Sequence, residues 1–285
     1  MQSATPRRST VGRRGPAWRA LVGVPLVAVL GQGAVCLPPK GEIDRVSRAE
    51  YDLARDALER RDPRQALDHV ARAVAADEAN ADAAYLGAVI LLGFCSAEEA
   101  SSDCRYAEAE SYARRALAAD PDHRDARNAL GVVLVNEKRP ADAIEVLKPL
   151  ADDILYGSPE KAWGNLGWAQ LEAGLPDEAI ASLKRAVAAA PSYCVGHLHL
   201  GDAYRAKREH AAARQAYGRA LEIDKGDCSR LQEAYLGRAE SSIALGQPAD
   251  ATEDLQRCRD VAPQTAVGRT CAHKLQVLKQ DQNGG

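Results

Sequence analysis

The chain repeats a pattern of apolar and small residues with a period of about 34 positions. In the clearest copy, residues 160–193, such residues recur three and four positions apart, the spacing of a helix with one buried face. That copy contains Trp163, Leu166, Gly167, Gly174, Ala179, Ile180, Leu183, Ala186 and Pro191. The same skeleton, with losses, divides the sequence into six units: 47–79, 80–123, 124–159, 160–193, 194–231 and 232–263. The pattern predicts an all-α repeat protein.

These residues resemble the tetratricopeptide repeat, a unit of two antiparallel helices, and the resemblance covers roughly residues 47–263. Small residues at the eighth, twentieth and twenty-seventh places of the repeat allow the helices to approach to about 8 Å. Each unit buries its faces only against its neighbours, so the resemblance implies a right-handed superhelix with a concave surface. Ser47 and Glu50 predict a capping box at the start of the first helix.

The array is expected to end in a capping helix over residues 264–281. This segment keeps helical spacing and has polar residues suited to an outer face, namely Lys274, Lys279 and Gln280. Such a helix would cover the last unit and keep the array in solution. We expect residues 282–285 to be a disordered tail.

The N-terminus is typical of a bacterial export signal, which we place at residues 1–35. It contains five arginines and no acidic residue, then an apolar run at 20–30 and a short stretch of small residues. The run is about 11 residues long, too short to cross roughly 30 Å of hydrocarbon as a helix. A disordered extension with an apolar patch is the alternative.

Cys36 follows this signal and resembles the lipidated cysteine of bacterial lipoproteins, although two of the three residues before it depart from the usual box. The resemblance implies a lipid anchor at Cys36, a linker at 36–46 and a soluble body held to the membrane. The residue after Cys36 is Leu37 and not the aspartate associated with inner-membrane retention, which favours the periplasmic side of the outer membrane. Cleavage nearby, releasing a soluble periplasmic protein, stays open.

Six further cysteines, an even number in an exported chain, predict disulfides. Cys95 and Cys104 share an insertion of about ten residues in the second unit, and Cys194 and Cys228 occupy equivalent turns of adjacent units. Cys258 faces inward, opposite the expected capping helix that carries Cys271. We therefore predict the pairs Cys95–Cys104, Cys194–Cys228 and Cys258–Cys271. Free buried thiols are the alternative.

The sequence indicates neither an enzyme nor a metal or cofactor site. His197 and His199 are the closest histidine pair, and on a helix they project about 200° apart. The sequence contains no His-Glu-x-x-His, no nucleophile elbow and no Cys-x-x-Cys. The formal net charge is −3, and without the five N-terminal arginines it is −8. This acidic body disfavours a nucleic-acid partner.

The expected concave surface carries the clearest candidate binding site. In tetratricopeptide proteins the first helix of each unit lines this surface, and the corresponding positions here form a largely apolar strip. Its residues are Tyr51, Leu91, Val132, Val135, Trp168, Leu171, Leu198 and Leu236. Exposed apolar patches commonly mark binding sites, and Trp168 is the best anchor candidate. Superhelical curvature, or the chain's own N-terminal segment, could instead cover part of the strip.

Six such units behind a lipoprotein-like signal look like the pilotin family of type IV pilus biogenesis. That resemblance implies a non-enzymatic protein-interaction scaffold in the bacterial cell envelope that assists assembly of an outer-membrane secretin. Its partner would be a protein, and it would touch the membrane only through its lipid anchor. The alternative is a structural adaptor that organises another envelope machine or peptidoglycan enzymes.

Overall fold

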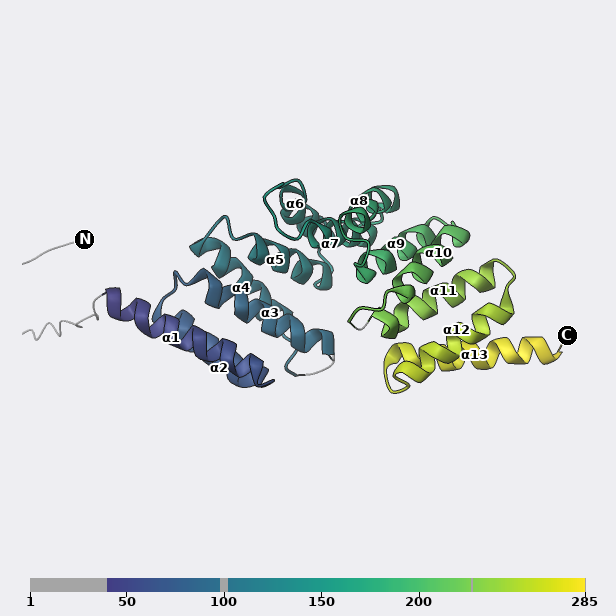
Figure 1. The fold of residues 1–285 in the computed structure, drawn as a ribbon, viewed down its shortest axis with the longest axis horizontal. Helices are drawn as coiled ribbons and strands as arrows, with labels where there is room; N and C mark the ends of the chain where they lie inside the picture. The colour runs from purple at the N-terminus through teal and green to yellow at the C-terminus, as the bar shows by residue number, and fades with distance from the viewer. Residues whose placement is uncertain (1–39, 98–101, 227, 285) are drawn as a thin grey trace, which may run out of the picture. The chain divides into compact units, whose positions relative to one another are not determined.

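The computed structural model describes residues 40–97, 102–226 and 228–284. Within these ranges the chain forms thirteen α-helices and one short 3-10 helix, with no strand (Figure 1). The export signal at 1–35 and the lipid-attachment cysteine at 36 lie outside the described residues. No helix in the described ranges is long and apolar enough to span a membrane.

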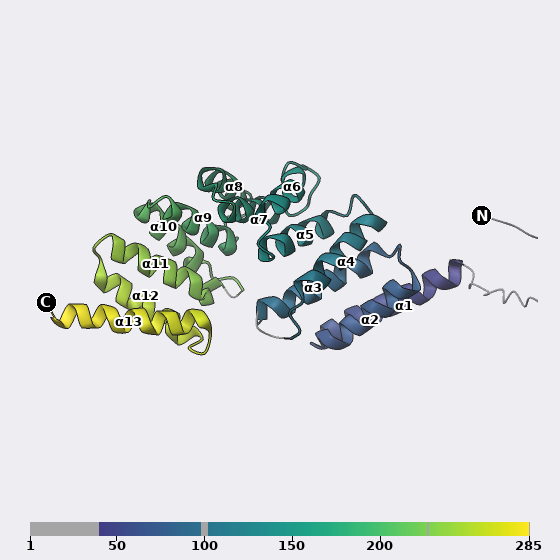
Figure 2. The ribbon, with the colours of Figure 1, turned by 180° about the vertical axis from the view of Figure 1, so that it is seen from behind.

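The helices follow one another as consecutive antiparallel pairs, and both views place each helix beside its neighbours in the chain (Figures 1 and 2). Their bounds are α1 Lys40–Glu59, α2 Pro63–Ala76, α3 Ala81–Ala97, α4 Tyr106–Ala119, α5 Arg124–Asn136, α6 Pro140–Ala151, α7 Pro159–Glu172, α8 Pro176–Ala189, α9 Cys194–Ala206, α10 His210–Glu222, η1 Cys228–Arg230, α11 Gln232–Ala244, α12 Pro248–Val261 and α13 Ala266–Gly284.

The turns inside five of these pairs have the same backbone conformation. In each, one residue has a positive φ, in the left-handed region, two positions before the next helix begins. Gly174 (φ 75°) and Gly246 (φ 71°) hold this position in two pairs. Arg61, Lys138 and Arg208 hold it in the others with φ of 62°, 61° and 60°. A side chain makes this conformation unfavourable by roughly 1–2 kcal/mol, so packing of the flanking helices must maintain it.

The core forms where a large side chain of the second helix meets a small residue of the first. Tyr217 of α10 is the largest fully buried side chain in the described part of the chain. It lies between Gly201 of α9 and Gly237 of α11, where added Cβ atoms would come within 2.6 Å and 2.4 Å of its ring. Glycine is therefore required on both sides because a tyrosine fills the gap between two successive units.

The start of the first unit differs from the prediction. Helix α1 begins at Lys40, inside the expected linker at 36–46, so Ser47 lies within the helix and the predicted capping box is wrong. Ser47 is 1% exposed; its hydroxyl donates to the Ala73 carbonyl (2.9 Å) and accepts from the Asn80 side-chain amide (2.8 Å). Glu50 instead accepts from Arg72 and contacts His69 on α2. Both polar residues connect α1 to its neighbours.

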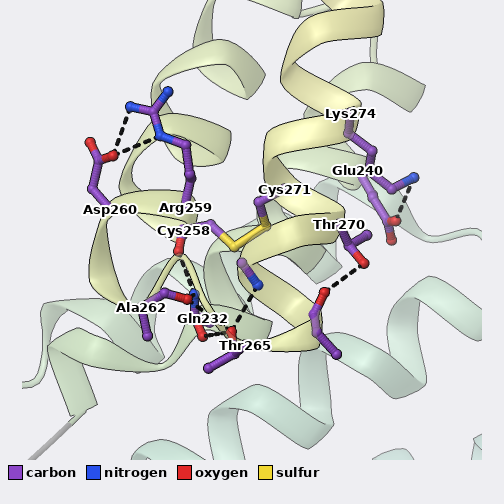
Figure 3. Close-up of a disulfide and its surroundings, with 12 residues drawn as sticks. Gln232, Glu240, Cys258, Arg259, Asp260, Ala262, Thr265, Thr270, Cys271 and Lys274 are labelled. Carbon is purple, nitrogen blue, oxygen red and sulfur yellow. Dashed lines mark hydrogen bonds and ion pairs between the residues drawn. A yellow bond between two sulfur atoms is a disulfide. The ribbon is translucent and has the colours of Figure 1, made fainter.

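The last helix, α13, packs along α11 and α12 as the expected cap and runs to Gly284, through most of the predicted tail. Figure 3 shows how its first turns are held. Cys258 and Cys271 form a disulfide, and the Gln232 side chain donates to the Cys258 carbonyl at 2.6 Å. The Thr265 hydroxyl donates to Gln232 at 2.7 Å and accepts from the Gly268 amide, which caps the helix.

Two further disulfides lie at irregular parts of the array. Cys95 and Cys104 (Cα–Cα 4.4 Å) link the last turn of α3 to the segment before α4, within the insertion. Cys194, the first residue of α9, is joined to Cys228 of η1 (Cα–Cα 5.8 Å), which ties the α10–α11 connection to the previous unit. All three pairs are those that the sequence predicts.

Candidate protein-binding groove

The odd-numbered helices form the inner wall of the array. In addition to their contacts with the even-numbered helices, they contact one another in the series α3–α5, α5–α7, α7–α9 and α9–α11. The helices of the inner wall of a curved repeat array lie closest together, so side chains on this side of the odd-numbered helices face the groove.

Three residues of the predicted apolar strip do not lie on this surface. Leu91 is 0% exposed, Val135 is 1% exposed and Leu198 is 7% exposed. Each packs in the hydrophobic core of the array and therefore cannot contact a partner. A continuous apolar strip was the wrong expectation, because several of its positions face neighbouring helices.

The other five strip residues, Tyr51, Val132, Trp168, Leu171 and Leu236, are partly exposed. The structure brings Trp168 and Leu171 together in a hollow of ≈ 420 Å³ formed by α7 and α9. Tyr51 lies elsewhere, in a hollow of ≈ 590 Å³ at the junction of α1 with the start of α3. Burial raises the pKa of the Tyr51 phenol, so this side chain stays neutral.

The hollow at Trp168 combines an aromatic stack with charged side chains. The Trp168 indole lies parallel to the His199 imidazole, with ring centroids 5.3 Å apart and planes 6° apart. Around this stack the wall is completed by Glu172, Asp202 and Arg205. The site therefore combines a flat aromatic surface with neighbouring side chains of negative and positive charge.

Hydrogen bonds hold the α9 side of this hollow in place. Asp202 accepts from the buried Tyr217 hydroxyl (2.7 Å), and Arg205 donates to the same hydroxyl (3.2 Å) and to Glu240 of α11 (2.6 Å). Burial, reinforced by the Asp202 carboxylate, raises the pKa of Tyr217 far above its ordinary value and keeps it a donor. Lys274 of the cap contacts Glu240 at 3.0 Å, so the network reaches α13.

Tetratricopeptide repeat models match residues 51–100, 104–154, 150–193 and 196–227, which together exceed half of the sequence. The chain belongs to the tetratricopeptide repeat family. Repeats of this family generally serve as protein-interaction scaffolds. The predicted architecture, an all-α superhelix of repeat units with a capping helix, is confirmed.

Among solved structures, the fold of this tetratricopeptide protein resembles those of PilW and PilF. PilW, titled a widely conserved type IV pilus biogenesis factor, gives a TM-score of 0.65 at 22% identity, covering 79% of this chain and 98% of PilW. PilF of Pseudomonas aeruginosa gives 0.61 at 20% identity, covering 82% and 99%. A human IFIT1 dimer gives 0.59 at 17% identity, covering 73% and 48%. No curated protein matches the sequence.

Within the tetratricopeptide framework, the two neighbouring histidines have separate roles. His199 stacks on Trp168, whereas the His197 ring contacts the Pro191 carbonyl at 3.1 Å, and burial lowers the pKa of His197. Across the described ranges, no three His, Cys, Asp or Glu side chains form a group that could hold a metal ion. His199 is thus part of the aromatic surface of the hollow, and His197 contacts the turn that precedes α9.

Sequence reasoning missed the polar half of the groove. His199, Asp202 and Arg205 recur at intervals of three along α9, which places them on one face of the helix beside the groove. That spacing was a usable signal. Attention to apolar residues alone selected Leu198, which points into the core, instead of its neighbour His199.

Proposed function

We propose that this protein is a non-enzymatic protein-interaction scaffold of the bacterial cell envelope that assists outer-membrane secretin assembly in type IV pilus biogenesis. The observation that carries this proposal is the likeness to PilW and PilF, which extends over 98% and 99% of those chains with TM-scores of 0.65 and 0.61. The likeness in fold therefore extends over almost the full length of both proteins.

The groove supports a protein partner for this role. Trp168 and Leu171 present apolar surface, while Glu172, Asp202 and Arg205 at the edge of the same hollow offer polar contacts. An aromatic anchor surrounded by polar side chains is the usual composition of an energetically important interface centre. We assign partner binding to the hollow at Trp168, with Tyr51, Val132 and Leu236 as secondary contacts along the inner wall.

An envelope location is supported by the cysteines and by the N-terminal pattern. Three disulfides suit an oxidising compartment such as the periplasm. The export signal at 1–35 would deliver the chain there, and a lipid on Cys36 would hold it at the periplasmic side of the outer membrane. Cleavage without lipid attachment would give a soluble periplasmic protein with the same groove.

The test is complementation in a strain that lacks the gene. Secretin multimers resistant to detergent should disappear on deletion and return with the wild-type chain. A chain carrying Trp168→Glu and Leu171→Glu should restore few multimers while remaining folded. Cys36→Ser should move the protein from the membrane fraction to the soluble periplasmic fraction. Normal multimers after deletion would contradict the secretin role and favour the adaptor that organises another envelope machine.

A further inference from the structure

The connection between α6 and α7 presents two large aliphatic side chains to solvent. Ile154 is 95% exposed and Leu155 is 74% exposed; we call this pair the aliphatic tip. Among the side chains that the structure describes, the next most exposed large aliphatic is Val46 at 50%. Single surface aliphatics are ordinary, but an adjacent pair left almost wholly in water is not explained by the fold.

The residues on both sides of the aliphatic tip are anchored. The Asp153 carboxylate accepts hydrogen bonds from Arg124 (2.6 Å) and from the Leu155 amide (2.8 Å). The bond from Arg124 has the larger effect, and both lower the pKa of Asp153. After the tip, Tyr156 is 6% exposed and its hydroxyl donates to Asp125 at 3.0 Å. The array therefore holds the two aliphatic side chains outward instead of folding them into its core.

The surface beside the aliphatic tip is acidic. A hollow of ≈ 430 Å³ is lined by Tyr156 together with three aspartates, Asp82, Asp120 and Asp125. Its one arginine, Arg124, is already paired with Asp153. A second arginine, Arg127, also acts on Asp153, but the four carboxylates outnumber these two arginines, so the tip presents apolar and negative surface together.

We propose that the aliphatic tip is a second docking site, which inserts Ile154 and Leu155 into an apolar recess of a protein partner whose rim carries lysine or arginine side chains. The recess removes the two aliphatic side chains from water, and the basic rim pairs with the carboxylates of the adjacent hollow. This site is separate from the hollow at Trp168, and the chain can therefore hold two segments of a partner, or two partners, at once.

The charge beside the aliphatic tip favours a different protein as its binding partner over an anionic lipid surface or a second copy of this chain. An anionic lipid surface would repel the aspartates around the tip, because like charges oppose each other within a Debye length of about 8 Å. A second copy docking tip to tip would bring the same carboxylates together. A basic apolar recess on a different protein meets neither penalty.

The test uses the full chain in its own cells, with a photo-crosslinking amino acid at Leu155. We expect one main protein adduct, with the crosslinked peptide mapping to an apolar segment flanked by lysine or arginine. Adding Ile154→Asp should reduce the adduct at least about tenfold, as loss of an interface anchor does. The matched control Val46→Asp, at the next most exposed aliphatic, should leave the adduct unchanged. A crosslinker moved to the exposed Glu145 of α6 should give no such adduct.

Three results would overturn the proposal: adducts only to lipid, adducts only between copies of this chain, or equal adducts from positions 155 and 145. Folding does not confound the result, because Ile154 is 95% exposed and its replacement should leave the melting temperature of the purified chain unchanged.

Once the partner is purified, the salt dependence of binding tests the role of charge. Raising the salt concentration from about 0.1 to 0.5 M, which roughly halves the Debye length, should weaken binding, and Asp120→Lys should weaken it further.

Discussion

Trp168 and His199 stack in parallel across two successive repeat units, with ring centroids 5.3 Å apart and ring planes 6° apart. The stack places an indole from α7 and an imidazole from α9 in one wall, so the shape of the hollow depends on the spacing of two units. Because Tyr217 and Arg205 tie α9 to α10 and α11, this spacing is coupled to the C-terminal units and to the cap.

Trp168→Ala should weaken binding of the groove partner by about 2 kcal/mol or more, roughly 30-fold in Kd, because it removes the aromatic anchor. Titration of the purified partner measures this loss. His197→Ala is the matched control, since His197 is on the same helix as His199 but contacts the Pro191 carbonyl. An equal loss of affinity in both variants would show that the effect comes from general disturbance of α7 and α9.

Gly237→Ala should lower the free energy of unfolding by about 1–3 kcal/mol, because the new Cβ would lie 2.4 Å from the ring of Tyr217. Gly93→Ala is the control: Gly93 lies in α3 with nothing within 4 Å of an added Cβ, and this change should raise stability by up to about 1 kcal/mol. Urea unfolding checks both. Equal effects would show that Tyr217 is not packed against Gly237.

Replacing both Cys258 and Cys271 by serine should lower stability by about 3 kcal/mol, since the bond closes a short loop and joins α12 to the cap. Amide exchange along α13 should accelerate most, which hydrogen-exchange mass spectrometry measures. The double replacement at Cys95 and Cys104 serves as control and should leave exchange in α13 unchanged, because that bond lies in α3 and the insertion.

The stabilising effect of Glu50 should depend on pH. Hydrogen bonding with His69, and then with Arg72, lowers the pKa of Glu50 below its ordinary value of 4.5. The folded state therefore favours the carboxylate, so its contribution is present above pH 4.5 and is lost as the pH falls through the lower folded pKa. At pH 7, Glu50→Gln should cost about 0.5 kcal/mol.

Thermal unfolding of wild type and Glu50→Gln between pH 7 and pH 3 tests this dependence. The difference in Tm should shrink toward zero at the acid end. Glu59→Gln, on the exposed side of the same helix, should show little difference at any pH. A Glu50→Gln difference that grows on acidification would show that the folded state does not favour the Glu50 carboxylate.

The repeat pattern was sufficient to predict helix order and the cap, because most helix pairs keep a glycine or alanine at the same places. Gly167 and Gly201, for example, occupy equivalent positions, and both meet a large side chain of the second helix. The pairs Cys194–Cys228 and Cys258–Cys271 followed from the same register, and Cys95–Cys104 followed from the insertion that both residues share. The start of the first unit was harder to predict. Serine is a common helix N-cap residue, but Ser47 lies inside α1 and makes its hydrogen bonds to α2 and to the residue before α3.

By itself the sequence determined the all-helical repeat, its family and the positions where units must pack closely, since local spacing and side-chain size dictate these features. Only the tertiary structure decided which apolar residues meet water. Leu198 and Leu155 are the same residue type, yet one is 7% exposed in the core and the other 74% exposed beside an acidic hollow. Exposure depends on how successive units pack against each other and on how the connection between α6 and α7 is anchored, and both are set by contacts between residues distant in the chain.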